Sequence, residues 1–430
     1  MERFALSRMK EWKENENRKP LIIRGARQVG KTWIMKTFGQ QYFEKTAYVN
    51  FDNNARMKQV FEGDLDIERL VLSISAETGV SIEAENTLII FDEVQEVPKA
   101  LTSLKYFYEN APQYAIVAAG SLLGVALHQG TSFPVGKVDF LDLYPLNFRE
   151  FLCAMGEKQF VSMLDSCDTQ MVTVFKTKYI ERLREYYFVG GMPEVVKDFS
   201  EKKDYNRVRA IQKNLINYYQ QDFSKHAEIK LVPRLNLVWN SIPMQLAKEN
   251  KKYIYGQVRE GSRAKDFELA IQWLLDCGLI HKVQRIQKPD LPLKAYIDFD
   301  AFKLFLVDIG LLIAMTDLDA KVIIEGNKIF TEFKGALTEQ YILQQLISDV
   351  GVIPYYYSTQ NSKGEIDFLV QGKTSVIPIE VKAEENLKAK SLKAFCEKYQ
   401  PSYAVRTSMS DYREQDWMTN IPLYAISTYF

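Results

Sequence analysis

The sequence contains few of the residues that build disulfide frameworks, zinc sites or histidine-based active sites. Its 430 residues include four cysteines, none of them in a CxxC pair, and three histidines that lie far apart in the chain. A zinc knuckle, a disulfide scaffold and a Ser/His/Asp triad are therefore not indicated. This use of cysteine predicts a reducing environment.

The sequence also lacks net charge and long apolar runs. Its 55 basic residues balance its 55 acidic residues, so bulk charge predicts no nucleic-acid or membrane partner, although a local patch could still bind one. The most apolar stretch, residues 114–127, is too short for a bilayer, which needs roughly 20 helical residues. The first residues, MERFALSRMKEW, lack the apolar core of a signal peptide. We therefore expect a cytoplasmic protein.

The composition is that of a globular protein with several domains. Hydrophobic residues make up 47% and charged residues 26% of the chain, which disfavours disorder and fibrous repeats. At roughly 150 residues per domain, the length predicts two to four domains.

The order of strand-like and helical segments predicts the α/β class. In residues 1–151, the apolar runs PLIIR, TAYVNF, NTLIIFDEV and YAIVAAGS alternate with amphipathic stretches, which is typical of a mostly parallel sheet. Residues 152–230 have helical periodicity and are interpreted as a helical lid. Residues 231–324 read as helices followed by two strand-like runs, as in a winged helix. Residues 325–430 are predicted to form a second α/β unit.

A phosphate-binding loop is predicted directly after the first strand. The segment GARQVGKT has the G-x-x-x-x-G-K-[ST] pattern between an apolar strand and a helix, which is the context that the motif requires. Its backbone N–H groups would face phosphates, Lys31 would reach the β and γ phosphates, and Thr32 would bind Mg²⁺. The predicted nucleotide-binding residues are Gly25, Ala26, Arg27, Gln28, Val29, Gly30, Lys31 and Thr32.

Two further strand ends carry polar side chains. The strand TLIIFDEV ends in Asp92, which could hold Mg²⁺, and in Glu93, which could orient a water towards the γ-phosphate. The strand YAIVAAGS ends in Ser121, which could sense the γ-phosphate. A Gly-Ser turn is also common without such a role.

The chain resembles prokaryotic AAA-type ATPases that carry a C-terminal domain of unknown function. The resemblance rests on PLIIRGARQVGKTW, YVNFD, FDEVQEVPKAL, LKYFYENAP, AAGSLLGVAL and SFPVGKVDFLDLYPLNFREFL. It implies binding of ATP or ADP, Asp92 as a metal ligand together with Thr32, Glu93 as the catalytic base, and Ser121 as the sensor.

The resemblance leaves the source of an arginine finger open. Some relatives have arginines after the sensor strand, where this chain has Pro134, Val135, Gly136 and Lys137. Arg149 is a candidate substitute but reads more simply as an ordinary surface arginine. An oligomer that supplies such a residue remains an open expectation.

The winged-helix segment has a mixed charge pattern. Arg259, Arg263 and Lys265 lie near the start of its second helix, where they could meet DNA phosphates, but Asp266 and Glu268 would oppose this approach. A plain packing module explains the segment equally well.

The last segment carries a set of charged residues in the order found in restriction-endonuclease-like nucleases. Glu339 lies in a helix, Asp367 in a strand, and Glu380 and Lys382 on one face of the strand IPIEVKA. The resemblance implies that the three carboxylates bind a divalent metal and that Lys382 helps activate water. A structural ion network with no cleavage is the alternative.

Two functional hypotheses follow. The first is an ATP-hydrolysing protein whose C-terminal modules bind or process DNA. The second is a nucleotide-dependent switch or scaffold that binds a protein partner and has a vestigial nuclease-like domain.

Overall fold

The computed structural model describes residues 1–430 except 121–132, 249–250, 326–330, 360–363 and 386–388. The chain divides into two compact units. The N-terminal unit comprises residues 2–144 and 276–278. The C-terminal unit comprises residues 145–275 and 279–430, together with Met1.

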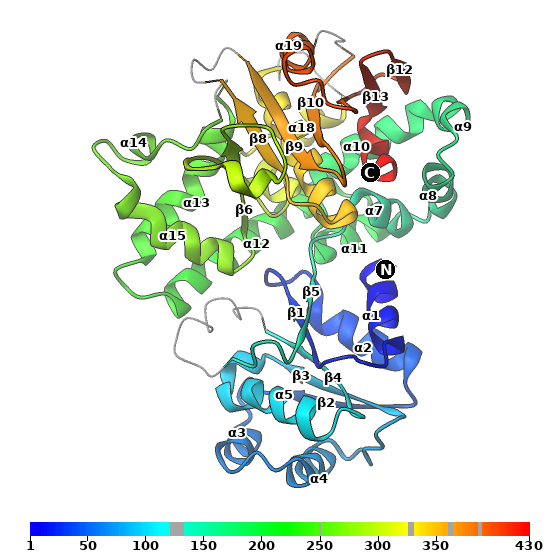
Figure 1. The fold of residues 1–430 in the computed structure, drawn as a ribbon. Coiled ribbons are helices and arrows are strands. Elements are labelled where there is room, and N and C mark those ends of the chain that lie inside the picture. The colour runs from blue at the N-terminus through cyan, green and yellow to red at the C-terminus, as the bar shows by residue number, and fades with distance from the viewer. Residues whose placement is uncertain (121–132, 249–250, 326–330, 360–363, 386–388) are drawn as a thin grey trace. The chain divides into compact units, whose positions relative to one another are not determined.

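The centre of the N-terminal unit is a parallel sheet (Figure 1). Its described strands follow the order β2-β3-β4-β1-β5, and every neighbouring pair is parallel. The strands are β1 (Leu21–Arg24), β2 (Lys45–Asn50), β3 (Thr87–Asp92), β4 (Ala115–Ala119) and β5 (Asp139–Asp142). The helices are α1 (Ala5–Glu14), α2 (Lys31–Tyr42), α3 (Ala55–Glu62), α4 (Ile67–Thr78) and α5 (Pro98–Asn110), with the short turn η1 (Val94–Glu96).

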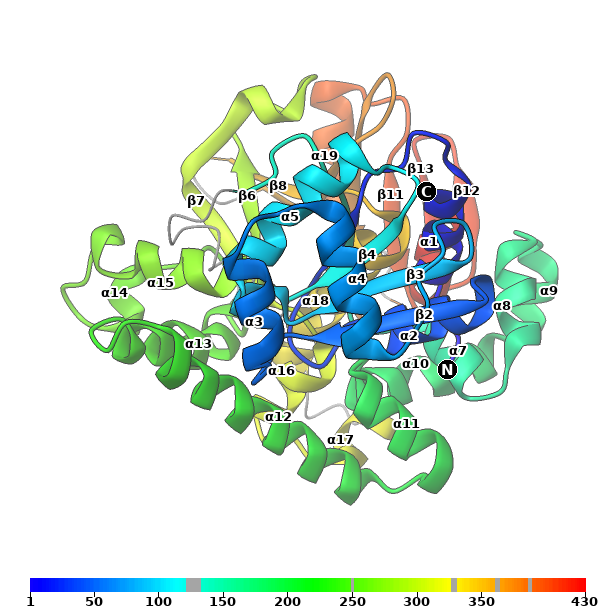
Figure 2. The same ribbon diagram turned by 90° about the horizontal axis from the view of Figure 1, so that it is seen from below.

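Helices cover both faces of this sheet (Figure 2). Alternate residues of a strand point to opposite faces, so Ile89 and Phe91 of β3 join the apolar core beneath α3, α4 and α5. The other face is covered by α2, which in turn contacts α1. All six residues of β3 are buried, which explains why the strand reads as a continuous apolar run rather than an alternating one.

The predicted parallel α/β core is confirmed. The four apolar runs identified in the sequence are β1 to β4. The additional strand β5 was not predicted, because it lies at the sheet edge and its sequence, DFLD, is only partly buried. A search for buried apolar runs does not detect such a strand.

The C-terminal unit contains a mixed sheet. In the described residues its order is β12-β13-β11-β10-β9-β8-β6-β7, with parallel and antiparallel neighbours. The strands are β6 (Ile280–Ile286), β7 (Ile297–Leu306), β8 (Tyr355–Ser358), β9 (Glu365–Gln371), β10 (Val376–Val381), β11 (Val405–Ser408), β12 (Arg413–Gln415) and β13 (Met418–Pro422).

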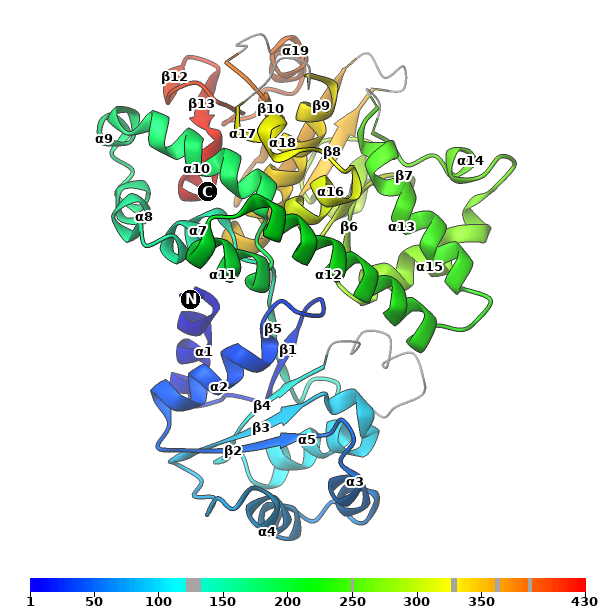
Figure 3. The same ribbon diagram turned by 180° about the vertical axis from the view of Figure 1, so that it is seen from behind.

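Helices make up much of the rest of this unit. Figure 3 shows α10 and α12 beside α16, which both of them contact. Within the described part of the chain, no helix has both the length and the apolar character needed to cross a membrane. The helices are α7 (Phe148–Ala154), α8 (Lys158–Asp165), α9 (Thr169–Val174), α10 (Lys176–Val189), α11 (Pro193–Lys202), α12 (Tyr205–His226), α13 (Val232–Leu246), α14 (Tyr255–Val258), α15 (Ala264–Asp276), α16 (Ile309–Met315), α17 (Ala320–Ile324), α18 (Thr331–Gln345) and α19 (Lys390–Tyr399); the shorter helical turns are η3 (Leu293–Tyr296), η5 (Leu346–Val350) and η6 (Leu423–Tyr429).

One sheet runs through the two segments that were expected to be a winged helix and a nuclease-like unit. The strand β6, from the first segment, pairs in parallel with β8, from the second. The wing-like hairpin of β6 and β7 therefore extends the sheet of the last segment. The boundaries predicted at residues 151, 230 and 324 remain predictions.

A buried aspartate joins the turn after α10 to the start of α16. Asp308 caps α16 by accepting from the Leu311 N–H and also accepts from the Gly191 N–H at 2.6 Å. Gly190, which ends α10, has φ +73°, and a Cβ there would lie 2.2 Å from the Asp308 carboxylate. Burial raises the pKa of Asp308 to about 6, although these backbone N–H groups act in the opposite direction.

This raised pKa predicts a stability that falls as pH rises. At pH values between the ordinary pKa of an aspartate and about 6, Asp308 keeps its proton in the folded protein but has lost it in the unfolded chain. The free energy of unfolding should therefore decrease over this range by on the order of 3 kcal/mol. The Asp308→Asn variant has no such titration, so the stability advantage of the wild type over this variant should narrow as pH rises.

Thermal unfolding of the two proteins across this pH range tests the prediction. Asp308→Ala is the matched control, because it also removes the titrating group while removing the cap entirely. Both variants should show the same change in pH dependence. Parallel curves for wild type and variants would contradict the assignment.

Candidate functional site

The predicted phosphate loop lies between β1 and α2, as the motif requires. Gly25 has φ +146°, and a Cβ there would lie 2.1 Å from the Leu143 carbonyl oxygen, so this position tolerates only glycine. Gly30 is the N-cap of α2, and no side chain caps the helix. The first N–H groups of α2 have no partner within the helix and are available to phosphate oxygens.

Lys31 is held against the loop. Its ammonium donates to the carbonyl oxygens of Gly25 and Ala26 at 2.8 and 2.7 Å. Burial lowers the pKa of Lys31 to about 8, and the nearby carboxylates of Glu93 and Asp92 partly oppose this shift. The lysine is therefore a buried cation whose hydrogen bonds are to neutral carbonyls, in a position to exchange them for bonds to an anion.

Thr32 and Asp92 meet although they are 60 residues apart. The Thr32 hydroxyl donates to Asp92 Oδ2 at 2.7 Å, and the Tyr48 hydroxyl donates to the same oxygen at 2.9 Å. Asp92 is the last residue of β3 and is buried. A hydroxyl beside a carboxylate supplies the hard oxygen ligands that Mg²⁺ prefers, so this pair fits the predicted metal.

Sequence reasoning missed the contact of Tyr48. Tyr48 belongs to β2, which pairs directly with β3. Burial and the hydrogen bond to Asp92 raise the pKa of its hydroxyl above the ordinary value. The apolar pattern of TAYVNF indicated a strand, but nothing in it indicated that this phenol would reach the carboxylate.

Glu93 follows Asp92 in an unusual backbone conformation. Its φ is +50°, in the left-handed region that non-glycine residues rarely adopt. Residues in this region often occur at functional sites. The Glu93 carboxylate accepts from Gln95 Nε2 at 2.7 Å. The structure thus adds Gln95, a neighbour that the sequence motif did not single out.

We predict that Gln95→Leu will lower ATP turnover about tenfold, because one hydrogen bond to a charged group is worth roughly 1.5–3 kcal/mol. Affinity for ATP should not change, since Gln95 contacts the carboxylate and not the phosphate loop. Turnover and equilibrium binding should be measured separately. Gln40→Leu, at an exposed position of α2, is the control. Loss of affinity with unchanged turnover would contradict a positioning role.

The outcome differs for two other predicted residues. Ser121 lies outside the described residues, two positions after β4 ends at Ala119. Arg149 belongs to the C-terminal unit, where its guanidinium pairs with Asp165 at 2.6 Å and with Asp349 at 3.2 Å. These two ion pairs indicate that Arg149 has a structural role in this unit.

The four charged residues predicted in the C-terminal unit do converge. Asp367 on β9 accepts from the Val381 N–H of β10 at 2.7 Å, and Glu380 accepts from Lys382 at 2.6 Å. Burial, followed by the charges of Glu339 and Glu380, raises the pKa of Asp367 well above its ordinary value. These carboxylates are therefore close enough to repel one another.

Lysines that the sequence did not indicate complete this cluster. Lys251 and Lys303 both pair with Glu339, and Lys303, which is fully buried, also pairs with Glu365. Burial raises the pKa of Glu339, but the two lysines more than offset it, so the net shift is downward. Lys382 is therefore not the only lysine that pairs with these carboxylates.

The charges of this cluster balance without a metal. When Asp367 holds its proton, the carboxylates of Glu339, Glu365 and Glu380 face the ammonium groups of Lys251, Lys303 and Lys382. Among the described residues, no group of three or more His, Cys, Asp or Glu side chains is arranged to hold a metal ion. The metal site at Glu339, Asp367 and Glu380 stays a prediction.

The basic residues of the segment that was expected to form a winged helix lie on the surface. Arg259, Arg263 and Lys265 are exposed, as are the acidic neighbours Glu260 and Glu268. The described surface at this point therefore carries both signs of charge. The structure does not single it out as a phosphate-binding face.

Three family models match separate parts of the chain. Residues 17–152 match an AAA domain, and residues 180–322 and 334–426 each match a domain of unknown function (DUF8612 and DUF4143, respectively). None of the curated proteins matches the chain.

Solved structures with similarity to the chain include a Walker-type ATPase and Cdc6p. The Walker-type ATPase PABY2304 of Pyrococcus abyssi is 14% identical, with 73% of this chain and 95% of that chain covered and a TM-score of 0.45. Cdc6p from Pyrobaculum aerophilum is 9% identical, with 73% and 92% covered and a TM-score of 0.26.

Proposed function

We propose that this chain, an AAA-type P-loop protein by its residues 17–152, binds ATP with Mg²⁺ and hydrolyses it to ADP and phosphate. The observation that carries the proposal is the hydrogen bond between Thr32 and Asp92. It joins the end of the phosphate loop to the end of β3, beside Glu93. A phosphate cradle, a pair of metal ligands and a base thus belong to one site.

Each part of the site has a separate task in this proposal. The N–H groups at the start of α2 and the ammonium of Lys31 bind phosphate oxygens. Thr32 and Asp92 would hold Mg²⁺, which neutralises charge on the phosphates when bound. Glu93 orients a water and accepts its proton, and Gln95 positions the Glu93 carboxylate. Ser121 is proposed to contact the γ-phosphate.

Release of phosphate from ATP, measured with and without Mg²⁺, tests the proposal. We expect turnover only in the presence of the metal, together with saturable ATP binding. Binding without release under any divalent cation would contradict hydrolysis and leave a nucleotide-binding protein.

Two proposals remain for the C-terminal unit. DNA binding or processing is supported by the convergence of Glu339, Asp367, Glu380 and Lys382. A switch or scaffold for a protein partner, with a vestigial nuclease-like unit, is supported by the balance between carboxylates and lysines. We favour the second, because a cluster that is neutral without a metal needs no cation to be stable.

The two proposals predict different results with Mn²⁺. If the unit processes DNA, the protein should bind Mn²⁺ at a saturable site in calorimetry and nick plasmid DNA, and Asp367→Ala should abolish both. If the network is structural, neither should occur, and Asp367→Ala should change only the stability. Salt-dependent retardation of DNA without nicking would support DNA binding alone.

A further inference from the structure

The C-terminal unit contains a cavity of about 300 Å³ that is lined by none of the charged cluster residues described above. Its walls come from one face of α10, from α17, from the first turns of α18 and from the segments that follow β10 and β11. These two strands are parallel neighbours, and sites beyond the carboxyl ends of parallel strands commonly bind ligands. The volume is at the lower end of the range for small-molecule sites.

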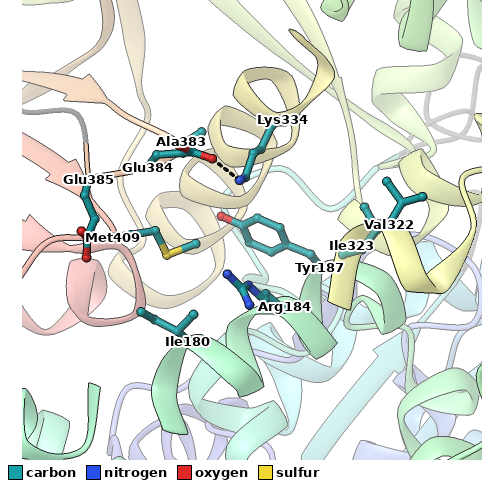
Figure 4. A pocket seen from close by; sticks show the side chains of 10 residues that line it. All are labelled: Ile180, Arg184, Tyr187, Val322, Ile323, Lys334, Ala383, Glu384, Glu385 and Met409. Atoms are coloured by element: carbon teal, nitrogen blue, oxygen red, sulfur yellow. Dashed lines mark hydrogen bonds and ion pairs between the residues drawn. The ribbon is translucent and has the colours of Figure 1, made fainter. Parts of the chain in front are cut away.

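Two cations point into this cavity (Figure 4). Lys334 pairs with the exposed Glu384, so a carboxylate already lies at the position that a ligand's carboxylate would take. Arg184 is half-buried, and its guanidinium donates to the Ile324 carbonyl oxygen at 3.4 Å. The structure gives Arg184 no carboxylate partner among the residues that it describes. The positive charge of Arg184 is therefore available to a ligand.

A buried hydroxyl lies between these cations. The ring of Tyr187, which is 5% exposed, extends from α10 towards Lys334 (Figure 4). Its hydroxyl forms no hydrogen bond of ordinary geometry in the described structure. The Thr338 side chain lies near it, and the Thr338 hydroxyl donates to the Lys334 carbonyl oxygen at 2.8 Å. Buried polar groups without a partner are rare, and a bound molecule is one of the few explanations.

The remaining walls are apolar except for Glu385, whose carboxylate pairs with the Lys176 ammonium at 2.8 Å. Ile180, Val322, Ile323 and Met409 line the cavity beside the polar groups (Figure 4). A phosphate dianion has no apolar part that could pack against these side chains. Its second negative charge would also require a second free cation. A planar carboxylate matches a single guanidinium through two parallel hydrogen bonds, and a hydrocarbon body would cover the apolar walls.

We propose that this cavity binds a carboxylate carried on a short apolar body, with Arg184 and Lys334 bonding the carboxylate and Tyr187 donating from its hydroxyl. The ligand would join α10 and α17 to α18 and the segment after β10. The carboxylate could belong to a free organic acid or to the C-terminus of a peptide. The proposal is independent of nucleotide binding.

Titration calorimetry of the full chain with hexanoate tests the site. We expect saturable binding that is much weaker for acetate, which lacks the apolar body, and for hexan-1-ol, which lacks the charge. An acetylated tripeptide ending in leucine, with a free or an amidated terminus, distinguishes the two sources. Binding of the free-terminus peptide but not of hexanoate would assign the site to a peptide end.

Three variants make the test specific. Arg184→Met should weaken binding at least tenfold, and Tyr187→Phe should weaken it about tenfold, as expected for hydrogen bonds to a charged group. Because the Tyr187 hydroxyl forms no hydrogen bond of ordinary geometry among the described residues, Tyr187→Phe should change the thermal midpoint little. Lys178→Met, an exposed charge on the same helix that does not line the cavity, is the control and should bind as the wild type does.

Several results would overturn the proposal. These are the absence of saturable binding of both hexanoate and the peptide, equal affinity of wild type and Arg184→Met, or tighter binding of inorganic phosphate than of hexanoate. If Arg184→Met does not fold, unchanged binding by Tyr187→Phe still contradicts the assigned contacts.

Discussion

Lys31→Ala should weaken ATP binding by about 100-fold, since the lysine is expected to form hydrogen bonds to charged phosphate oxygens, each worth roughly 1.5–3 kcal/mol. In the structure its ammonium is buried and bonded to two loop carbonyls. Those bonds keep it beside the loop, where phosphates would bind. The loss should appear in the dissociation constant and not only in turnover, because the charge of ATP is already present in the ground state.

Equilibrium binding of ATP or ADP measures this effect. Lys58→Ala is a matched control, because it removes the same charge from an exposed position on α3 in the same unit. The control should bind nucleotide with wild-type affinity. Unchanged affinity of Lys31→Ala would remove the phosphate loop from the proposed site.

Glu93→Gln should lower ATP turnover about 100- to 10,000-fold, which is the usual contribution of a general base, and should leave ATP affinity nearly unchanged. The glutamine keeps the size of the side chain and can still accept from Gln95 through its amide oxygen. It cannot take a proton from the attacking water. The variant should therefore trap the protein with ATP bound.

A nearby glutamate provides the control for this experiment. Glu96→Gln changes an exposed glutamate of the turn η1, three residues further along the chain. It should hydrolyse ATP at the wild-type rate. If Glu93→Gln also does so, another residue is the base, and the unusual backbone conformation of Glu93 has a different cause.

The C-terminal cluster combines residues that belong to a sequence motif with lysines that do not. The structure brings Glu339, Asp367, Glu380 and Lys382 together, and burial, followed by the charges of Glu339 and Glu380, raises the pKa of Asp367. The lysines that offset the repulsion come from elsewhere. Lys303 lies on β7 and Lys251 precedes α14, and neither belongs to a recognisable motif.

The sequence by itself determined the features that depend on neighbouring residues. The loop at residues 25–32, its strand and helix, and the carboxylates at the end of β3 follow from local spacing and from the apolar character of buried parallel strands. An AAA-type domain was identified on the same residues, and residues 17–152 match the family model of an AAA domain.

Only the tertiary structure decided which distant side chains meet. Tyr48 reaches Asp92 because β2 pairs with β3, and the hairpin of β6 and β7 extends the last sheet because β6 pairs with β8. The cavity at Arg184 and Tyr187 forms where α10 meets segments more than 130 residues further along the chain. Strand pairing and helix packing are set by the burial of whole apolar faces, so they are not encoded in the spacing of any short motif.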